Sequence, residues 1–329
     1  MRLCRTHERI FLQNPGRWLL PVLLFFLLSA GDICGEVGRF ADNRDGTVTD
    51  RLTGLMWTKD ADPAADSYDW FRALDAVSRF NEAGYCGYND WRIPNVNELA
   101  SLIDRGRHAP ALPAGHPFRN IHVWYWTGTT TADYSNHAWR IYSFLGHIDY
   151  GHKYYMFNHV WPVRTAGDAS FVIPKTGQQV FYYKGDDGFL RKGRGLPKER
   201  FTDNGDGTVT DRVSGLMWTK SADLPLGRKD WIKAGEFIAR LNTEGYCGYR
   251  DWRLPEVADL RTLIDYAGED PVLPEHHPFS HVDSGIYWSS EPNVQDPRYV
   301  WCVDLKNSRV DCYNKLNHRQ YVWPVRGGG

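Results

Sequence analysis

One short triplet of this chain carries side-chain oxygens that could bind a metal ion. The triplet Glu291-Pro292-Asn293 precedes an expected strand that carries Asp304. Carboxylate and amide oxygens are the ligands that Ca²⁺ prefers. Two hypotheses follow: a calcium site at Glu291, Asn293 and Asp304, or an ordinary solvated loop. We favour the solvated loop and expect no cofactor, because a match of three residues arises often by chance in a loop.

Catalytic side chains show no order that indicates an enzyme. The sequence has no nucleophile elbow and no serine–histidine–carboxylate order, and His152, His276 and His277 lack the spacing of zinc ligands. We therefore expect a protein without catalytic activity.

The composition restricts the partners and suits a fold of short strands. The 39 Lys and Arg oppose 40 Asp and Glu, for a net charge of −1. Nucleic-acid-binding domains usually carry a large positive excess, so we expect no nucleic-acid partner. The 14 Trp, 18 Tyr and 15 Phe, together with 31 Gly, favour strands and tight turns.

The chain contains one long sequence twice. Residues 39–59 and 200–220 are identical at 17 of 21 positions. The offset of 161 residues continues beyond these stretches and becomes 162 after one extra residue near Gly285. Repeats of solenoid proteins are about 20 to 50 residues long. A period this long therefore indicates a duplicated domain.

Each copy has the same expected order of elements. The Asp-Asn-x-Asp-Gly stretches at 42–46 and 203–207 predict hairpin turns, and the first and twelfth ligands of a calcium loop are missing. Helical spacing over 231–242 and a shorter run over 257–265 predict two helices in the second copy. Strands are expected at 286–289, 299–305, 309–313 and 320–326. Short antiparallel strands with two helices indicate the fold class α+β.

The N-terminal segment predicts export. Residues 1–31 combine arginines, a short apolar core and small residues, as a signal peptide does. The alternatives are a retained membrane anchor, which would make the membrane a partner, and a lipoprotein attached through Cys34. We expect the chain in the periplasm, on the outer surface or secreted. Domains are expected at 36–166 and 167–329, the second with an extra N-terminal hairpin around 180–183.

Two cysteines of the second copy predict a disulfide. Cys302 and Cys312 flank an expected turn, and the first copy has Arg140 and Tyr150 at the matching positions. Joint presence in one copy and joint absence from the other is what a bridge would produce. Paired strands reach the Cα spacing of about 5.5 Å that a bridge requires, and an oxidising compartment permits it. The pairing stays open for the other cysteines beyond the signal segment: Cys34, Cys86 and Cys247.

These motifs together resemble one known family. The second copy carries PKTGQ, GDDG, FTDNGDGTVTD, GLMW, GYCGYRDWRLP, YWSS and VWPVR. They are similar to the DUF1566 family, also called the C-terminal domain of the Legionella collagen-like adhesin. The resemblance implies two tandem C-type-lectin-like domains and a surface protein, since the adhesin recognises sulfated polysaccharides. In sugar-binding lectins of that fold, a Glu-Pro-Asn loop holds calcium and vicinal sugar hydroxyls, and an Asn-Asp pair on the next strand completes the site; here Val303 stands in place of that Asn. The resemblance also implies a relation to formylglycine-generating oxidases, which need two copper-binding thiols closer together than Cys302 and Cys312. The collagen-like stalk of the adhesin is absent here.

Residues unique to the first copy are the candidates for a ligand surface. Tryptophans that recur in both copies are expected in the core, because the fold is what two copies share. The first copy alone combines aromatic rings with cationic side chains on its later strands, which suits stacking on an anionic glycan. The ligand-binding candidates are Trp124, Arg140, Tyr142, His147, Lys153 and Tyr154.

Two functions from different classes follow from the sequence. The first is an exported, non-catalytic adhesion module that binds an anionic or other extracellular polysaccharide, or a cell-surface protein. The alternative is a structural component of an envelope or pilus assembly that binds no glycan.

Overall fold

The computed structural model describes residues 38–166, 173–268 and 270–327, so the expected signal peptide and Cys34 lie outside the described residues. The first repeat contains β1 (Phe40–Asp42), β2 (Thr47–Asp50), β3 (Leu55–Thr58), α1 (Trp70–Glu82), η1 (Tyr85–Gly87), α2 (Val96–Ala100), β4 (Trp124–Thr130), β5 (His137–Tyr142), β6 (His147–His152) and β7 (Val163–Thr165). Helix α3 (Asp187–Leu190) follows. The second repeat contains β8 (Phe201–Asp203), β9 (Thr208–Asp211), β10 (Met217–Thr219), α4 (Trp231–Glu244), η2 (Tyr246–Gly248), α5 (Val257–Thr262), β11 (Ile286–Pro292), β12 (Tyr299–Asp304), β13 (Val310–Asn314) and β14 (Val325–Arg326).

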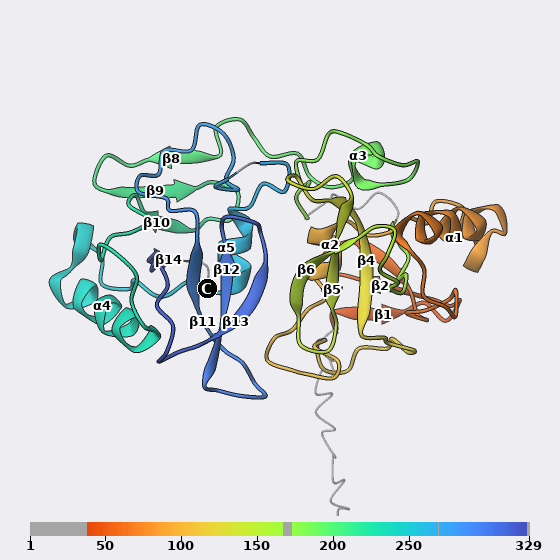
Figure 1. The fold of residues 1–329 in the computed structure, drawn as a ribbon, viewed down its shortest axis with the longest axis horizontal. Helices are drawn as coiled ribbons and strands as arrows, with labels where there is room; N and C mark the ends of the chain where they lie inside the picture. The colour runs from red at the N-terminus through yellow and green to blue at the C-terminus, as the bar shows by residue number, and fades with distance from the viewer. Residues whose placement is uncertain (1–37, 167–172, 269, 328–329) are drawn as a thin grey trace, which may run out of the picture. The chain divides into compact units, whose positions relative to one another are not determined.

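The repeats follow the expected order of elements (Figure 1). Each has a four-stranded antiparallel sheet, ordered β1-β2-β3-β7 in the first repeat and β8-β9-β10-β14 in the second. The chain is therefore a tandem of two sheet-rich domains with a few helices. The C-type-lectin-like fold that the resemblance implies stays a prediction. In the three ranges that the structure describes, no helix is long and apolar enough to cross a membrane.

The Asp-Asn-x-Asp-Gly stretch forms the turn between β1 and β2. A carboxylate oxygen of Asp45 accepts hydrogen bonds from the Thr47 amide at 2.9 Å and the Thr47 hydroxyl at 2.6 Å, and Asn43 donates to two threonine hydroxyls. Gly46 has a φ of +92°, which glycine adopts without a steric penalty. The β8–β9 turn repeats these bonds one period later. The prediction of hairpin turns is confirmed.

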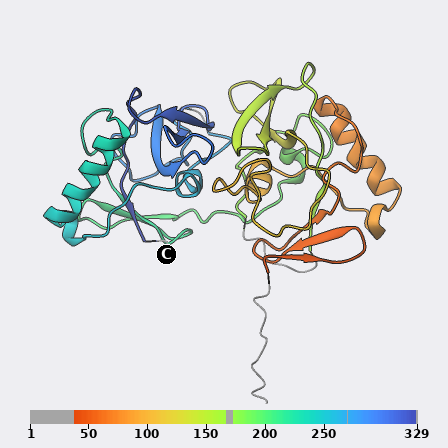
Figure 2. The same cartoon turned by 90° about the horizontal axis from the view of Figure 1, so that it is seen from below.

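Helices α1 and α4 begin at matching aspartates. Asp69 accepts a hydrogen bond from the amide of Arg72, and Asp230 accepts one from the amide of Lys233, both at 3.0 Å. Such a bond satisfies an amide that has no partner within the helix. Each helix buries its apolar face in a core of its own repeat. Figure 2 shows each helix along one side of its repeat.

The third sheet is shared by both repeats. Its order is β11-β12-β13-β6-β5-β4, and β13 pairs with β6 in antiparallel fashion, with Val310 opposite Ile148. These two residues differ by the offset of 162 and occupy the same position of the two repeats. An antiparallel pair centred on equivalent residues relates the two strands by a local two-fold axis. The repeats are therefore joined edge to edge through main-chain pairing.

The recurrent tryptophans are core residues. At most 3% of the surface of each one is exposed: Trp57, Trp91, Trp126, Trp161, Trp218, Trp252, Trp288 and Trp323. The indole of Trp161 donates a hydrogen bond to a carbonyl of β3, and Trp323 repeats that bond on β10. One hydrophobic cluster contains residues of both repeats. The prediction that recurrence marks the core is confirmed.

The segment between the repeats differs from the expected hairpin. Residues 173–199, all of which the structure describes, contain α3 and no strand. The carboxylate of Asp187 accepts a hydrogen bond from the Thr129 hydroxyl of β4 at 2.8 Å. The ring of Tyr183 packs against Phe71 of α1, with centroids 5.4 Å apart. The segment also contacts the second repeat, since the carbonyl of Thr176 accepts a hydrogen bond from the amide of Tyr266 at 2.9 Å. The prediction of a hairpin is therefore wrong, because this segment packs between the two repeats and forms no strand.

Cys302 and Cys312 do not form the expected disulfide. Cys302 on β12 lies opposite Asp311 of β13, and Cys312 lies opposite Trp301. Directly paired residues share a face of a sheet, while consecutive residues alternate between faces. The two thiols therefore lie on opposite faces, both are free, and the prediction of a bridge is wrong. The other described cysteines are also free and half-buried: Cys86 and Cys247.

Candidate ligand-binding site

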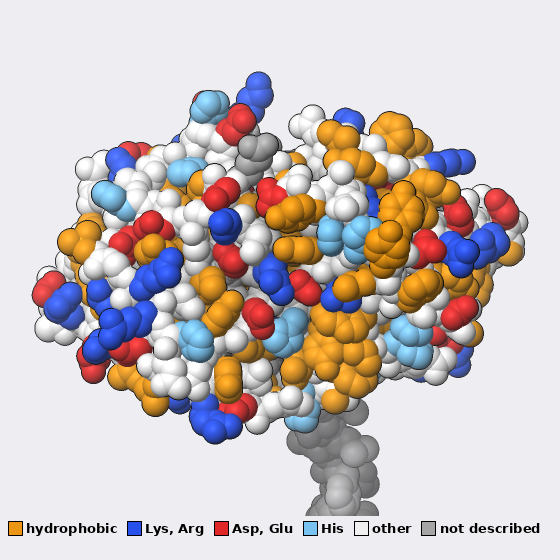
Figure 3. Space-filling view, viewed as in Figure 1, with side chains coloured by type: hydrophobic (Ala, Val, Ile, Leu, Met, Phe, Trp, Pro, Cys, Tyr) orange, Lys and Arg blue, Asp and Glu red, His pale blue; other side chains and the backbone are white. Residues whose placement is uncertain are grey.

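Four of the predicted ligand-binding residues come together on the first-repeat part of the shared sheet. Trp124 of β4 lies opposite Tyr142 of β5, which also lies opposite His147 of β6. The ring centroids are 5.0 Å apart for Trp124 and Tyr142, and 5.8 Å apart for Tyr142 and His147. The guanidinium of Arg140 lies 4.0 Å from the centroid of Trp124. We refer to Trp124, Arg140, Tyr142 and His147 as the aromatic row; Figure 3 shows hydrophobic and histidine side chains gathered over strands β4–β6.

A cavity of about 260 Å³ adjoins the aromatic row where β6 meets β13. Both repeats line it, through Trp124, Tyr142, His147, Ile148, Asp149, Arg309, Val310 and Asp311. Two ion pairs join the strands at this point. Nδ1 of His147 lies 3.0 Å from an oxygen of Asp311, and Nε of Arg309 lies 3.0 Å from an oxygen of Asp149. The two pairs are equivalent under the offset of 162, so the two-fold relation of the strands extends to their side chains.

Charges around the cavity are paired with one another. Asp149 faces both Arg309 and Arg140, the latter at 3.3 Å. Burial opposes the ionisation of Asp311, but hydrogen bonds from His147 and the main chain outweigh it and hold the pKa of Asp311 below its usual value. Two arginines thus stand beside two carboxylates. The site presents aromatic rings with donors and acceptors rather than a strongly positive patch.

Lys153 is not part of this surface. Only 1% of the residue is exposed, and its amine donates a hydrogen bond to the Thr130 hydroxyl at 2.8 Å. The amine also lies 4.0 Å from the ring centroid of Trp70 and 4.4 Å from that of Tyr182. Burial lowers the pKa of Lys153 to about 8. The prediction that Lys153 contacts a surface ligand is wrong, because α1 and the segment between the repeats cover it.

Tyr154 is exposed but lies apart from the aromatic row. It follows β6, and 59% of its surface is accessible. Its ring packs against Phe71 of α1, with centroids 4.7 Å apart. The structure therefore does not unite Tyr154 with Trp124 in one site.

The three residues of the calcium hypothesis serve three different local structures. An oxygen of Glu291 accepts a hydrogen bond from the first amide of α5, and burial raises the pKa of Glu291. The amide of Asn293 donates to the sulfur of Cys312, while Asp304 accepts a bond from the main chain of the turn that follows β12. Asn293 is buried, with 8% of its surface exposed, so this is not the solvated loop that the sequence favoured. The absence of calcium from these residues stays a prediction.

Sequence reasoning missed two groups of residues. Arg309 and Asp311 line the cavity from the second repeat, and their equivalence to His147 and Asp149 is a signal that could have found them. Asp62, His122 and His159 form the second group. They bring ligand atoms within 4.8 Å of one another, although they are far apart in the sequence.

Two sheet-rich repeats that present an aromatic row beside a cavity define a binding module. The chain belongs to the family of Lcl C-terminal domains, which it matches twice, over residues 46–164 and 207–326. This confirms the resemblance drawn from the motifs and indicates an adhesin-like binding module. No curated protein matches the chain.

Proposed function

We propose that the chain is an exported adhesin-like module that binds an extracellular polysaccharide at the aromatic row. The observation that carries the proposal is the row itself, in which four half-buried side chains meet beside a cavity of about 260 Å³. Large flat side chains combine an apolar face with a polar edge, which suits the apolar faces and hydroxyl rims of sugar rings. Membership of an adhesin-like family supports this class of function.

Hydrogen-bonding groups around the cavity support a sugar as the ligand. A sugar hydroxyl both donates and accepts a hydrogen bond. Arg140 and Arg309 provide donors, and Asp149 and Asp311 provide acceptors within the same lining or beside it. These groups already pair with one another, so a sugar hydroxyl would share the bonds that the charges make among themselves.

Because the charges around the cavity are paired, we expect the charge of the ligand to contribute little to its affinity. An acidic polysaccharide would meet Arg140 and Arg309, but Asp149 already faces both guanidinium groups. We therefore expect stacking to supply most of the affinity and added salt to weaken binding only modestly. A sulfated polysaccharide and its desulfated form distinguish the two contributions, because they differ in charge and not in their rings.

The second repeat offers a natural comparison. At the positions of Trp124 and Tyr142 it has Ile286 and Asp304, and Cys302 replaces Arg140. The aromatic row is therefore confined to the first repeat, and we expect one polysaccharide site per chain. A C-type-lectin-like fold, export through the N-terminal segment, and the absence of catalysis and of a calcium requirement belong to the same proposal.

Polysaccharide binding by Trp124→Ala tests the proposal. The mature protein is applied to a glycan array, and its dissociation constant for the best ligand is then measured by calorimetry. Truncation of a central tryptophan costs roughly 2 kcal/mol or more where it is a hot spot, which corresponds to roughly 30-fold weaker binding. Tyr142→Ala should also weaken binding.

Two matched controls make the result specific. Tyr155→Ala removes a more exposed ring of the first repeat, and Leu316→Ala removes an exposed apolar side chain of the second. Both should bind like the unchanged protein, and all variants should keep its melting temperature. Unchanged affinity in Trp124→Ala, or no ligand on the array, would overturn the proposal and favour a structural component of an envelope or pilus assembly.

A further inference from the structure

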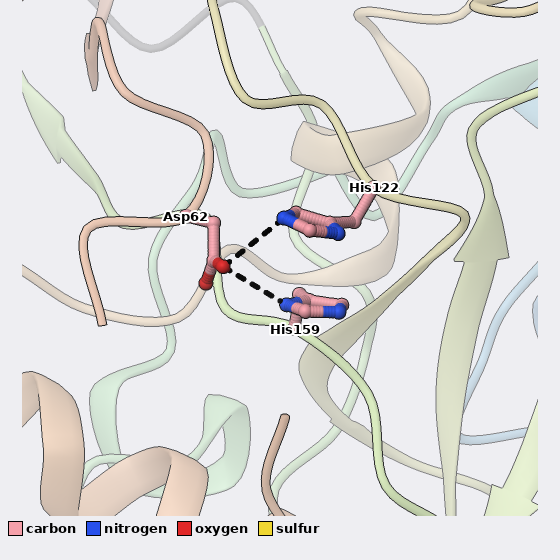
Figure 4. Close-up of side chains that lie close together, drawn as sticks. All are labelled: Asp62, His122 and His159. Carbon is pink, nitrogen blue, oxygen red and sulfur yellow. Dashed lines mark ion pairs between the residues drawn. The ribbon is translucent and has the colours of Figure 1, made fainter. Parts of the chain in front are cut away.

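One carboxylate and two imidazoles, none of which belongs to the aromatic row, converge in the first repeat (Figure 4). Nε2 of His122 lies 3.1 Å from Oδ2 of Asp62, and Nδ1 of His159 lies 3.2 Å from the same oxygen. The two imidazole rings stack with their centroids 3.7 Å apart and their planes 13° from parallel. Figure 4 shows each ring presenting a nitrogen to the carboxylate. Three ligand atoms of two chemical kinds thus surround one point.

Ordinary hydrogen bonding does not account for this arrangement. Asp62 is 93% buried, since its exposed fraction is 7%. Among the residues that the structure describes, its buried Oδ1 has no hydrogen-bond partner, and neither does Nδ1 of His159. A buried polar atom without a partner costs roughly 1–3 kcal/mol. Nδ1 of His159 lies 3.2 Å from Oδ2 of Asp62 without making a hydrogen bond, so both atoms stay available to a ligand.

We propose that Asp62, His122 and His159 bind a divalent transition-metal ion, with Zn²⁺ as the occupant. Imidazole nitrogens and a carboxylate oxygen are the ligands of many zinc sites, with bond lengths of about 2.0–2.2 Å. Ligand atoms at those bond lengths around one tetrahedral ion stand about 3.2–3.5 Å from each other. The observed separations of 3.1 and 3.2 Å between the carboxylate oxygen and the two nitrogens fit these distances. The stacked rings would have to turn on binding, so that the lone pairs of both nitrogens point at one ion.

Packing of the main chain holds the two histidines in place before any metal arrives. The amide of His122 donates a hydrogen bond to the hydroxyl of Tyr125 at 2.7 Å. The amide of His159 donates to the carbonyl of Trp124, and its carbonyl accepts a bond from the amide of Trp126. The side chain of His122 is 40% exposed, which leaves a route for an ion from solvent. Three protein ligands would leave a fourth position for water.

The second repeat keeps the carboxylate and lacks both imidazoles. Asp223 matches Asp62, but Asp283 and Tyr321 stand at the positions of His122 and His159. The main-chain setting is the same, because the amide of Asp283 also bonds to a tyrosine hydroxyl. Oδ2 of Asp223 accepts a hydrogen bond from the amide of Gly227 at 2.7 Å, while its buried Oδ1, like that of Asp62, has no partner among the described residues. The imidazoles, and not this oxygen, therefore distinguish the first repeat. The shared fold therefore does not require the two histidines, and we expect one metal ion per chain.

Zinc titration of the chelator-treated, dialysed protein tests the proposal. Calorimetry should report one Zn²⁺ per chain, and His122→Ala and His159→Ala should each weaken its binding by at least about tenfold. Saturating Zn²⁺ should also raise the melting temperature of the unchanged protein, because binding to the folded state alone stabilises it. Co²⁺ in place of Zn²⁺ should give visible absorption bands typical of tetrahedral coordination.

A matched variant separates this site from unspecific binding by surface histidines. Asp283→Ala alters the position of the second repeat that corresponds to His122, and it should leave stoichiometry and affinity unchanged. Melting temperatures without metal confirm that each variant folds. Zinc binding that survives unchanged in His122→Ala and His159→Ala, or no binding at 100 µM Zn²⁺ (a concentration roughly 100 times a micromolar dissociation constant), would overturn the proposal. The outcome does not depend on polysaccharide binding, because neither histidine belongs to the aromatic row.

Discussion

Replacing Asp187 by asparagine should change how the stability of the protein depends on pH. Asp187 is 94% buried, since 6% of it is exposed, and it lies where α3 meets β4. The hydroxyls of Thr129 and Thr176 donate to one of its oxygens at 2.8 and 2.6 Å. Burial raises its pKa from 3.8 to about 6, although the two hydroxyls act in the opposite direction. The buried site therefore favours the neutral acid.

The size of the effect follows from the pKa. A rise from 3.8 to about 6 corresponds to about 3 kcal/mol. Because the pKa is higher in the folded protein, this stabilising contribution is fully present below about pH 4 and is lost as the pH rises through 6. Asparagine carries no charge at any of these pH values. The stability of Asp187→Asn relative to the unchanged protein should thus increase by up to about 3 kcal/mol between pH 4 and pH 7.

Urea unfolding followed by tryptophan fluorescence at several pH values measures this difference. Comparing the two proteins at each pH removes the contributions of the other carboxylates. Thr129→Val supplies a control, since losing one hydroxyl donor should raise the pKa of Asp187 further and move the transition to higher pH. A difference between Asp187→Asn and the unchanged protein that stays constant from pH 4 to pH 7 would refute the reasoning.

Two other outcomes follow from the buried charges and thiols. Arg92→Ala should lower the free energy of unfolding by about 3–5 kcal/mol, because it leaves the fully buried carboxylate of Glu98 without its ion-pair partner. Urea unfolding measures this change, and a loss under 1 kcal/mol would contradict the prediction. Alkylation in denaturant without reductant should label both Cys302 and Cys312, because they lie on opposite faces of the sheet; labelling that requires reductant would show a bridge after all.

Local and duplicated features of this protein are readable from the sequence alone. Hairpin turns depend on residues a few positions apart, such as Asn43, Asp45 and Gly46, so their bonds follow from the motif. Recurrence of tryptophans in two copies marked the core, because both copies must fill the same interior. The family and its tandem organisation follow from the same repetition. The residues of the candidate site between Trp124 and His147 could also be predicted from the sequence, because they lie close together along the chain on consecutive strands.

The rest of the candidate site and the positions of the thiols depend on how strands that are distant in the sequence pair with one another. The contact of β13 with β6 brought Arg309 and Asp311 to the aromatic row, and no local pattern specifies which edge strands meet. A register that differs by one residue turns a side chain to the other face of a sheet, and this separated Cys302 from Cys312. Lys153 is buried by segments remote from it in the chain.

The cluster of Asp62, His122 and His159 shows the same limit most clearly. Its three members lie about 60 and 37 residues apart in the sequence, without the short spacing by which metal ligands are usually recognised. Only the folding of the loops before β4 and β7 onto the loop after β3 brings their ligand atoms within 4.8 Å. The sequence alone determines which residue types the first repeat has and the second lacks. The tertiary structure alone decides that these three meet, because burial and proximity depend on contacts between segments that are distant along the chain.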